Sequence, residues 1–249
     1  MKALRMEFYK CRRRKIWLAP LLMLAAQLTW GLYSLRNADA KELAQGWASI
    51  LYNFPILNAM MTPIIAAVVA SRIADIEHKG QTLKLLETIQ RTGALFDAKF
   101  LCAAWTMTWM VVMQTVAVVI FGLYQGFLGA PPWDQIGKHL LATWSVTLTI
   151  LLIQLILSLL IQNQMIGMLL GLLGALVGLF SLFFPQSLQR LFVWAYYGIL
   201  YVSAVDWDPD TRVVDYYFTA FDWQGMLCIV VIFVLLYAIG RWMFVRKEV

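Results

Sequence analysis

Six long stretches of the chain contain no Asp, Glu, Lys, Arg or His. They cover residues 16–33, 50–71, 100–125, 140–161, 165–183 and 223–240. About 20 residues of α-helix, rising 1.5 Å each, cross the ~30 Å hydrocarbon core of a bilayer. Backbone N–H and C=O groups must be paired within lipid, so these stretches are expected to be helices. The pattern predicts an all-α integral membrane protein with six transmembrane helices in a single domain, residues 1–249.

The composition agrees with this prediction. Hydrophobic residues make up 61% of the chain and charged residues 14%, whereas about a quarter of a soluble domain is charged. Ala38-Asp39-Ala40, which follows the first apolar stretch, also resembles a signal-peptide cleavage site. A basic leader that contains Glu7 and an apolar run of 18 residues favour a retained transmembrane helix.

The distribution of basic residues predicts the orientation, because cytoplasmic loops are enriched in Lys and Arg. With the N-terminus inside, the cytoplasmic segments hold 15 of the 20 Lys and Arg residues, and both termini are cytoplasmic. The outer segments hold only Arg36, Lys41, Lys138, Arg190 and Arg212. The net charge of +6 is therefore explained by topology, and no nucleic-acid partner is expected.

The three cysteines are Cys11, Cys102 and Cys228. They fall on the leader and within two of the apolar stretches, so no pair is expected to meet outside the membrane. The sequence thus predicts neither a disulfide nor a metal site.

Residues 1–15 are predicted to form a cytoplasmic amphipathic helix on the inner leaflet, because Met1, Leu4, Phe8 and Cys11 recur at helical spacing. A basic tail that only sets the topology is the alternative. In the second span, Pro55 and Pro63 each remove a backbone donor and are expected to kink or unwind the helix.

Residues 72–99 form the largest predicted cytoplasmic loop. Leu83, Leu86 and Ile89 lie on one helical stripe and charged residues lie elsewhere, which predicts a helix parallel to the membrane. Such a helix serves either as a docking surface for a cytosolic protein or as a simple re-entry turn. Arg91 and Lys99 are expected to anchor the far end of the loop at the lipid headgroups.

Four glycines of the fifth span share one helical face. Gly167, Gly171, Gly174 and Gly178 form two G-x-x-x-G pairs, and such pairs allow another helix to approach closely. The sequence predicts a helix-packing face, without indicating whether the partner helix belongs to the same chain.

Residues 184–222 are the longest outer segment. Its apolar, aromatic part, residues 191–205, is too short to cross a bilayer and predicts a re-entrant or interfacial helix. Acidic residues follow, and Asp206, Asp208, Asp210 and Asp215 are candidates for attracting cationic peptides. A calcium loop is disfavoured, because Thr211 stands where the turn glycine is needed.

No catalytic, cofactor-binding or metal site is predicted. The chain contains no G-x-x-x-x-G-K-[ST] motif, so ATP is not expected to bind by that route. The apolar stretches lack the ionisable side chains of a proton or ion relay. Polar residues within them, such as Gln27, Gln114 and Gln154, are expected to join helices, with a pathway for an amphiphile as the alternative.

The architecture resembles that of the ABC-2 permease family over the whole chain. The most specific stretch runs Glu77-His-Lys-Gly-Gln-Thr-Leu-Lys-Leu-Leu, followed by Arg91 and Ala98-Lys99. It is similar to the family pattern E-x-x-x-G-T-x-x-x-L-L…R…A-K, with Gln81 inserted between Gly80 and Thr82. The resemblance implies that an ATPase docks at Glu77, Gly80, Thr82, Leu83, Lys84, Leu86, Glu87 and Arg91.

Within the family, the size resembles that of the lantibiotic-immunity and bacitracin-resistance permeases. This resemblance implies a permease in the bacterial cell membrane that pairs with separate ABC ATPase subunits, which hold the ATP and Mg²⁺, and with a second permease chain, identical or homologous. It would expel membrane-active antimicrobial peptides. The alternatives are an ABC-2 exporter of another amphiphile, such as a drug, lipid or polysaccharide, and a membrane scaffold or sensor that transports nothing.

Overall fold

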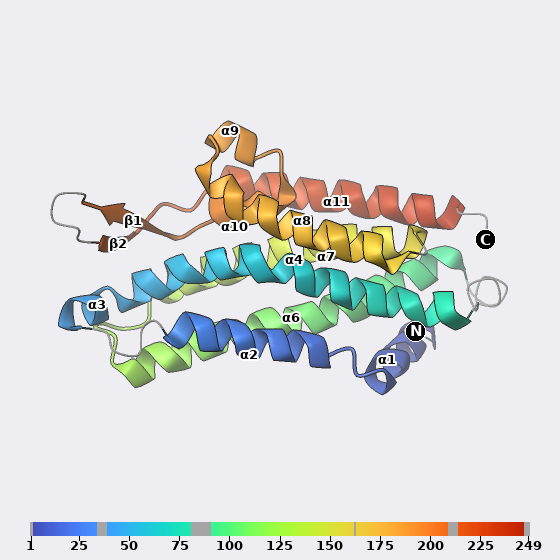
Figure 1. Ribbon diagram of the computed structural model, residues 1–249, viewed down its shortest axis with the longest axis horizontal. Coiled ribbons are helices and arrows are strands. Elements are labelled where there is room, and N and C mark those ends of the chain that lie inside the picture. Colours follow the sequence, from blue (N-terminus) through green and yellow to red (C-terminus); the bar gives the residue numbers. More distant parts are fainter. Residues whose placement is uncertain (1, 34–38, 81–90, 162, 209–213, 247–249) are drawn as a thin grey trace.

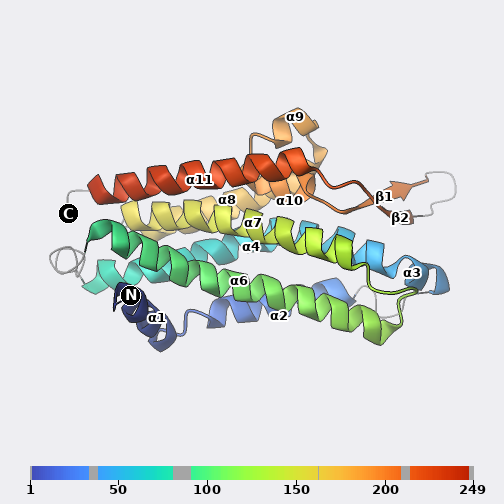
Figure 2. The same ribbon diagram turned by 180° about the vertical axis from the view of Figure 1, so that it is seen from behind.

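A computed structural model describes residues 2–33, 39–80, 91–161, 163–208 and 214–246. Within these ranges, six long helices run side by side along the long axis of the molecule (Figures 1 and 2). They are α2 (Leu18–Tyr33), α4 (Gly46–Gly80), α6 (Thr92–Gln125), α7 (Trp133–Leu160), α8 (Gln164–Phe180) and α11 (Trp223–Arg246). The helical membrane architecture predicted from the apolar stretches is confirmed.

The length and hydropathy of these helices agree with five or six membrane spans. Five of them are long and apolar enough to cross a bilayer by themselves. The shorter α2 meets the criterion only together with the preceding α1 (Lys2–Arg13), from which it is bent by 64°. The described helices also extend beyond the uncharged stretches, so that Lys99 lies in α6 and His139 in α7.

The two ends of the bundle differ in what they carry. One end holds α1, the last turn of α4, the start of α6 and the end of α11, so both termini lie there (Figures 1 and 2). The opposite end holds α3 (Ala40–Ala44) and a β-hairpin. We call them the inner end and the outer end, after the orientation that the basic residues predict.

Helix α4 occupies the centre of the bundle and packs against α2, α7 and α8. Small residues such as Ala66, Ala67 and Ala70 are fully buried and allow neighbouring helices to come close. The helix continues through Pro55 and Pro63, so the predicted unwinding at these prolines does not occur. The Asn53 amide donates to the Ser49 carbonyl one turn earlier.

The outer segment folds back into the bundle in short pieces. It comprises η1 (Ser181–Phe183), α9 (Gln186–Gln189), η2 (Val193–Ala195) and α10 (Tyr196–Ile199). Tyr196 and Tyr197 are buried, and the Tyr197 hydroxyl lies 2.8 Å from the Thr147 hydroxyl of α7. This hydrogen bond fixes the segment against the transmembrane helices.

An antiparallel hairpin follows, made of β1 (Ser203–Trp207) and β2 (Val214–Phe218). The sequence pattern did not predict it. The Ser203 hydroxyl donates to the Ala48 carbonyl of α4 at 2.7 Å, which ties the base of the hairpin to the bundle. The two strands lie at the outer end, which they share with α3 (Figure 1).

Candidate functional site

The two sides of the predicted ATPase-docking loop meet at the inner end. Gly80 is the last residue of α4, with Glu77 in the preceding turn, and Arg91 is the N-cap of α6. The remaining docking residues, Thr82, Leu83, Lys84, Leu86 and Glu87, lie outside the described residues. Docking on this loop therefore stays a prediction.

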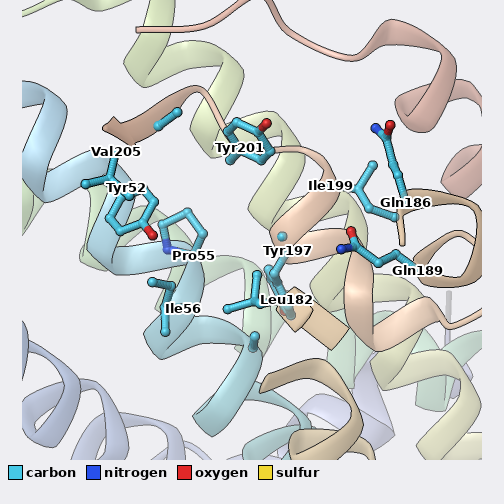
Figure 3. A pocket seen from close by; sticks show the side chains of 13 residues that line it. Tyr52, Pro55, Ile56, Leu182, Gln186, Gln189, Tyr197, Ile199, Tyr201 and Val205 are labelled. Carbon is cyan, nitrogen blue, oxygen red and sulfur yellow. The ribbon is translucent and has the colours of Figure 1, made fainter. Parts of the chain in front are cut away.

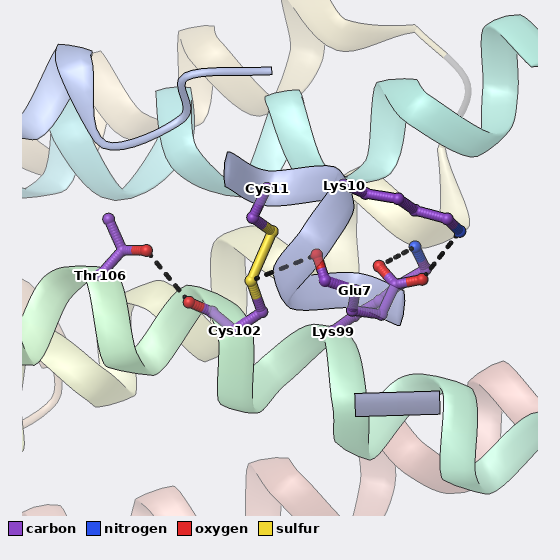
Figure 4. Close-up of a disulfide and its surroundings, with 6 residues drawn as sticks. All are labelled: Glu7, Lys10, Cys11, Lys99, Cys102 and Thr106. Atoms are coloured by element: carbon purple, nitrogen blue, oxygen red, sulfur yellow. Dashed lines mark hydrogen bonds and ion pairs between the residues drawn. A yellow bond between two sulfur atoms is a disulfide. The ribbon is translucent and has the colours of Figure 1, made fainter. Parts of the chain in front are cut away.

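A buried ion pair joins α1 and α6 at the inner end. The Glu7 carboxylate accepts from the Lys99 ammonium at 3.1 Å and from the Lys10 ammonium at 2.9 Å (Figure 4). Lys99 is 0% exposed, so its predicted role as a headgroup anchor is wrong. The only hint in the sequence was one acidic residue in an otherwise basic leader.

The same contact between α1 and α6 corrects the cysteine prediction. Cys11 and Cys102 are joined by a disulfide (Figure 4). The prediction considered only pairing in the aqueous segments, whereas α1 folds along the first turns of α6 and brings the two sulfur atoms together inside the protein. Cys228 is a free, exposed cysteine of α11.

Three buried amides connect α2, α4 and α6 within the bundle. Gln27 donates to Asn58 at 3.3 Å, Asn58 donates to Gln114 at 3.1 Å, and Gln114 donates to Gln27 at 3.0 Å. This closed ring satisfies polar groups that would be costly to leave unpaired away from water. The arrangement agrees with the interpretation of Gln27 and Gln114 as residues that join helices.

The glycine face of α8 lies against elements of the same chain. A Cβ atom at Gly171 would lie 2.6 Å from the Ala67 Cβ atom of α4 and 3.1 Å from the Pro63 carbonyl oxygen. A Cβ at Gly174 would overlap the Trp194 indole, one at Gly178 would lie 3.1 Å from the Trp194 carbonyl oxygen, and one at Gly167 would lie 3.3 Å from the Ser158 hydroxyl. The close approach of α8 to α4 thus requires glycine at Gly171.

The outer aspartates differ in their surroundings. Asp215 of β2 pairs with Lys41 at 2.7 Å and accepts from the Gln45 amide at 2.9 Å. These hydrogen bonds, that of Lys41 first, hold the pKa of the Asp215 carboxyl below its ordinary value. Asp206 stands directly opposite Asp215 in the hairpin and is exposed.

The other two aspartates proposed to attract cationic peptides are Asp208 and Asp210. Asp208 is exposed just after β1, and Asp210 lies outside the described residues. Attraction of cationic peptides by these four aspartates remains a prediction.

A cavity of about 450 Å³ opens beside this hairpin; we call it the outer cavity. Figure 3 shows Tyr52, Pro55 and Ile56 of α4 facing the side chains of Gln186 and Gln189 across it. Parts of η1, α10 and β1 complete the lining. No sequence motif marks this cavity, because its residues come from five separate elements.

Comparison with known proteins identifies the family. The model of the ABC-2 family transporter proteins matches residues 3–178, from the second residue of α1 to two residues before the end of α8. No curated protein matches the chain. Since the match covers well over half of the 249 residues, the chain belongs to the ABC-2 transporter family and is a multi-pass membrane permease component of an ABC exporter.

Proposed function

We propose that this permease expels membrane-active antimicrobial peptides, of the lantibiotic or bacitracin type, from the bacterial cell membrane. Separate ABC ATPase subunits bind the cytoplasmic loop between α4 and α6 and supply the energy, and a second permease chain, identical or homologous, completes the transporter. The termini are cytoplasmic, at the inner end.

The observation that carries the choice of substrate is the exposed acidic hairpin of the outer end. Asp206 is exposed there on β1, the strand that also lines the outer cavity, and Asp208 is exposed just after it. Cationic amphiphilic peptides accumulate at such a surface through long-range attraction, which salt weakens. Neutral lipids, drugs and polysaccharides would gain nothing from these charges.

Because ATP hydrolysis belongs to a separate subunit, the permease needs a cytoplasmic surface that binds the ATPase. Leu83 and Leu86 supply an apolar stripe, and Glu77, Lys84 and Glu87 supply charges that fix the register of docking. Reversing a charge that is partly desolvated at an interface costs about 2–5 kcal/mol, which corresponds to well over a tenfold loss of affinity.

The test is a pull-down of the ATPase with the wild-type chain and with Glu77→Lys or Leu86→Asp at matched membrane abundance. We expect both variants to lose the ATPase and its peptide-stimulated hydrolysis, whereas Glu248→Lys, the same charge reversal at the C-terminus, retains them. If both loop variants bind the ATPase normally, the loop is only a re-entry turn. If the wild-type chain binds the ATPase but cells that produce both proteins gain no resistance to peptides, the cargo is another amphiphile.

A further inference from the structure

We propose that the outer cavity binds a short uncharged segment of a cationic amphiphilic peptide while the cationic residues of the peptide lie over Asp206. This inference rests on the proposed function and specifies where the substrate is recognised.

The size of the cavity suits a ligand segment. Its volume of about 450 Å³ lies within the range of roughly 300–1,000 Å³ that is typical of small-molecule sites. A whole antimicrobial peptide is too large for this space, so only a few residues enter. The rest of the peptide must remain outside the cavity, over the part of the hairpin that follows the lining residues of β1.

The lining is uncharged but supplies hydrogen-bonding groups. None of its 13 residues is Asp, Glu, Lys, Arg or His, so it offers no partner for a cationic side chain. Apolar contacts come from Pro55, Ile56 and Ile199. The side chains of Gln186 and Tyr201 offer donors and acceptors at the same cavity.

A peptide segment needs this combination of contacts. Each of its residues carries a backbone N–H and C=O group that must be paired when water is removed, and its side chains gain from apolar burial. The Gln189 amide nitrogen is held by the Phe184 carbonyl at 2.8 Å, which fixes the side chain and leaves its oxygen to accept from a ligand. A lipid acyl chain has no hydrogen-bonding groups, so it would displace water from these side chains and leave them unpaired.

The edge of the cavity supplies one carboxylate for a cation. Asp206 lies two residues after Ala204, a lining residue, along β1, so the two side chains lie on the same face of the strand. Its cross-strand neighbour Asp215 is already engaged by Lys41. Like charges directly opposite each other on a sheet repel. Lys41 neutralises Asp215 on β2, and a peptide cation would neutralise Asp206 on β1.

The test uses the purified full chain in discs of uncharged phosphatidylcholine, without any ATPase. The probe is a fluorescein-labelled peptide with a short uncharged segment of Leu, Ala and Gly followed by a run of Lys, and its neutral twin has Gln in place of every Lys. Empty discs give the background from lipid binding. Ala204→Phe fills the cavity from β1, and the matched control Val214→Phe places the same ring on β2, away from the lining.

We expect Ala204→Phe to weaken binding of both peptides about tenfold, and Val214→Phe to leave both unchanged. Asp206→Asn should weaken binding of the cationic peptide about threefold at low salt, should lose this effect at high salt, and should not alter the neutral twin. Tyr201→Phe, which removes one hydroxyl and little volume, should weaken both by a smaller factor.

Unchanged binding of both peptides in Ala204→Phe and Tyr201→Phe would overturn the site, as would equal loss in Val214→Phe. This outcome is distinct from failure of the proposed function, which is measured in cells with the ATPase present. Peptide resistance that persists in Ala204→Phe would leave the export function intact and reject only the outer cavity as the place of recognition.

Discussion

Replacing Lys99 with Met tests whether the buried ion pair holds α1 to the bundle. The Lys99 ammonium lies 3.1 Å from the Glu7 carboxylate, and the two side chains are 0% and 2% exposed. Breaking a buried pair costs about 3–5 kcal/mol, and because Lys99→Met leaves the Glu7 carboxylate paired with the partly exposed Lys10 ammonium, we expect a cost at the lower end of this range. With about 2–4 °C per kcal/mol for a chain of this size, the melting temperature should fall on the order of 10 °C.

The same carboxylate provides an internal control. Lys10 also pairs with Glu7, at 2.9 Å, but its side chain is 24% exposed. Exposed ion pairs contribute about 0–1 kcal/mol, so Lys10→Met should lower the melting temperature by no more than a few degrees. In the double variant Glu7→Leu with Lys99→Met, both buried charges are gone, and most of the lost stability should return.

Thermal stability can be followed by heating the detergent-purified chain and measuring the surviving monodisperse peak by tryptophan fluorescence, since the chain has 11 Trp residues. The reasoning would be refuted if Lys99→Met melted within about 2 °C of wild type, or no earlier than Lys10→Met. It would also fail if the double variant were less stable than Lys99→Met alone.

Three further predictions address the helix packing, the amide ring and the topology. Gly171→Leu should abolish a monodisperse product, because its Cβ alone would lie 2.6 Å from the Ala67 Cβ atom. Gly137→Leu faces open space and should be tolerated. Equal behaviour of the two variants would reject the close α4–α8 contact. Gln114→Leu leaves hydrogen-bonding groups of the two other amides unpaired and should destabilise the chain by about 1–3 kcal/mol in the same melting assay, and a neutral result would remove the ring from the stabilising contacts. In a chain without its native cysteines, Cys at Thr211 should react with an impermeant maleimide in intact cells and Cys at Gln81 only after permeabilisation; the reverse pattern would invert the orientation.

The apolar stretches predicted the transmembrane helices well but not their ends. The second stretch covers residues 50–71, whereas α4 runs from Gly46 to Gly80, because Arg72 and Asp75 are compatible with a helix that continues past the lipid. Charge marks where the hydrocarbon ends, and a helix ends only where its backbone pairing stops. The same reasoning applies to α6, which begins at Thr92.

Contacts between distant residues could not be read from the pattern. Glu7 and Lys99 are separated by 92 positions, and a lysine near the end of a span has the same local sequence whether it reaches a headgroup or a buried carboxylate. The outer cavity presents the same difficulty, since α4, α10 and β1 meet only in the folded chain.

The hairpin, by contrast, did leave a signal in the sequence. Ser203–Trp207 and Val214–Phe218 contain β-branched and aromatic residues, and Asp208-Pro209-Asp210 between them is typical of a turn. The aromatic residues that precede it favoured an interfacial helix, and that interpretation was extended through Val205.

The unbroken course of α4 has a mechanical consequence. Its 35 residues form a rod on the order of 50 Å long, with Tyr52 of the outer cavity near one end and Gly80, where the docking loop begins, at the other. Tilting such a rod by about 10° around its midpoint moves each end by about 4–5 Å. Under the proposed function, α4 therefore joins the ATPase-binding loop to the mouth of the outer cavity as one continuous helix.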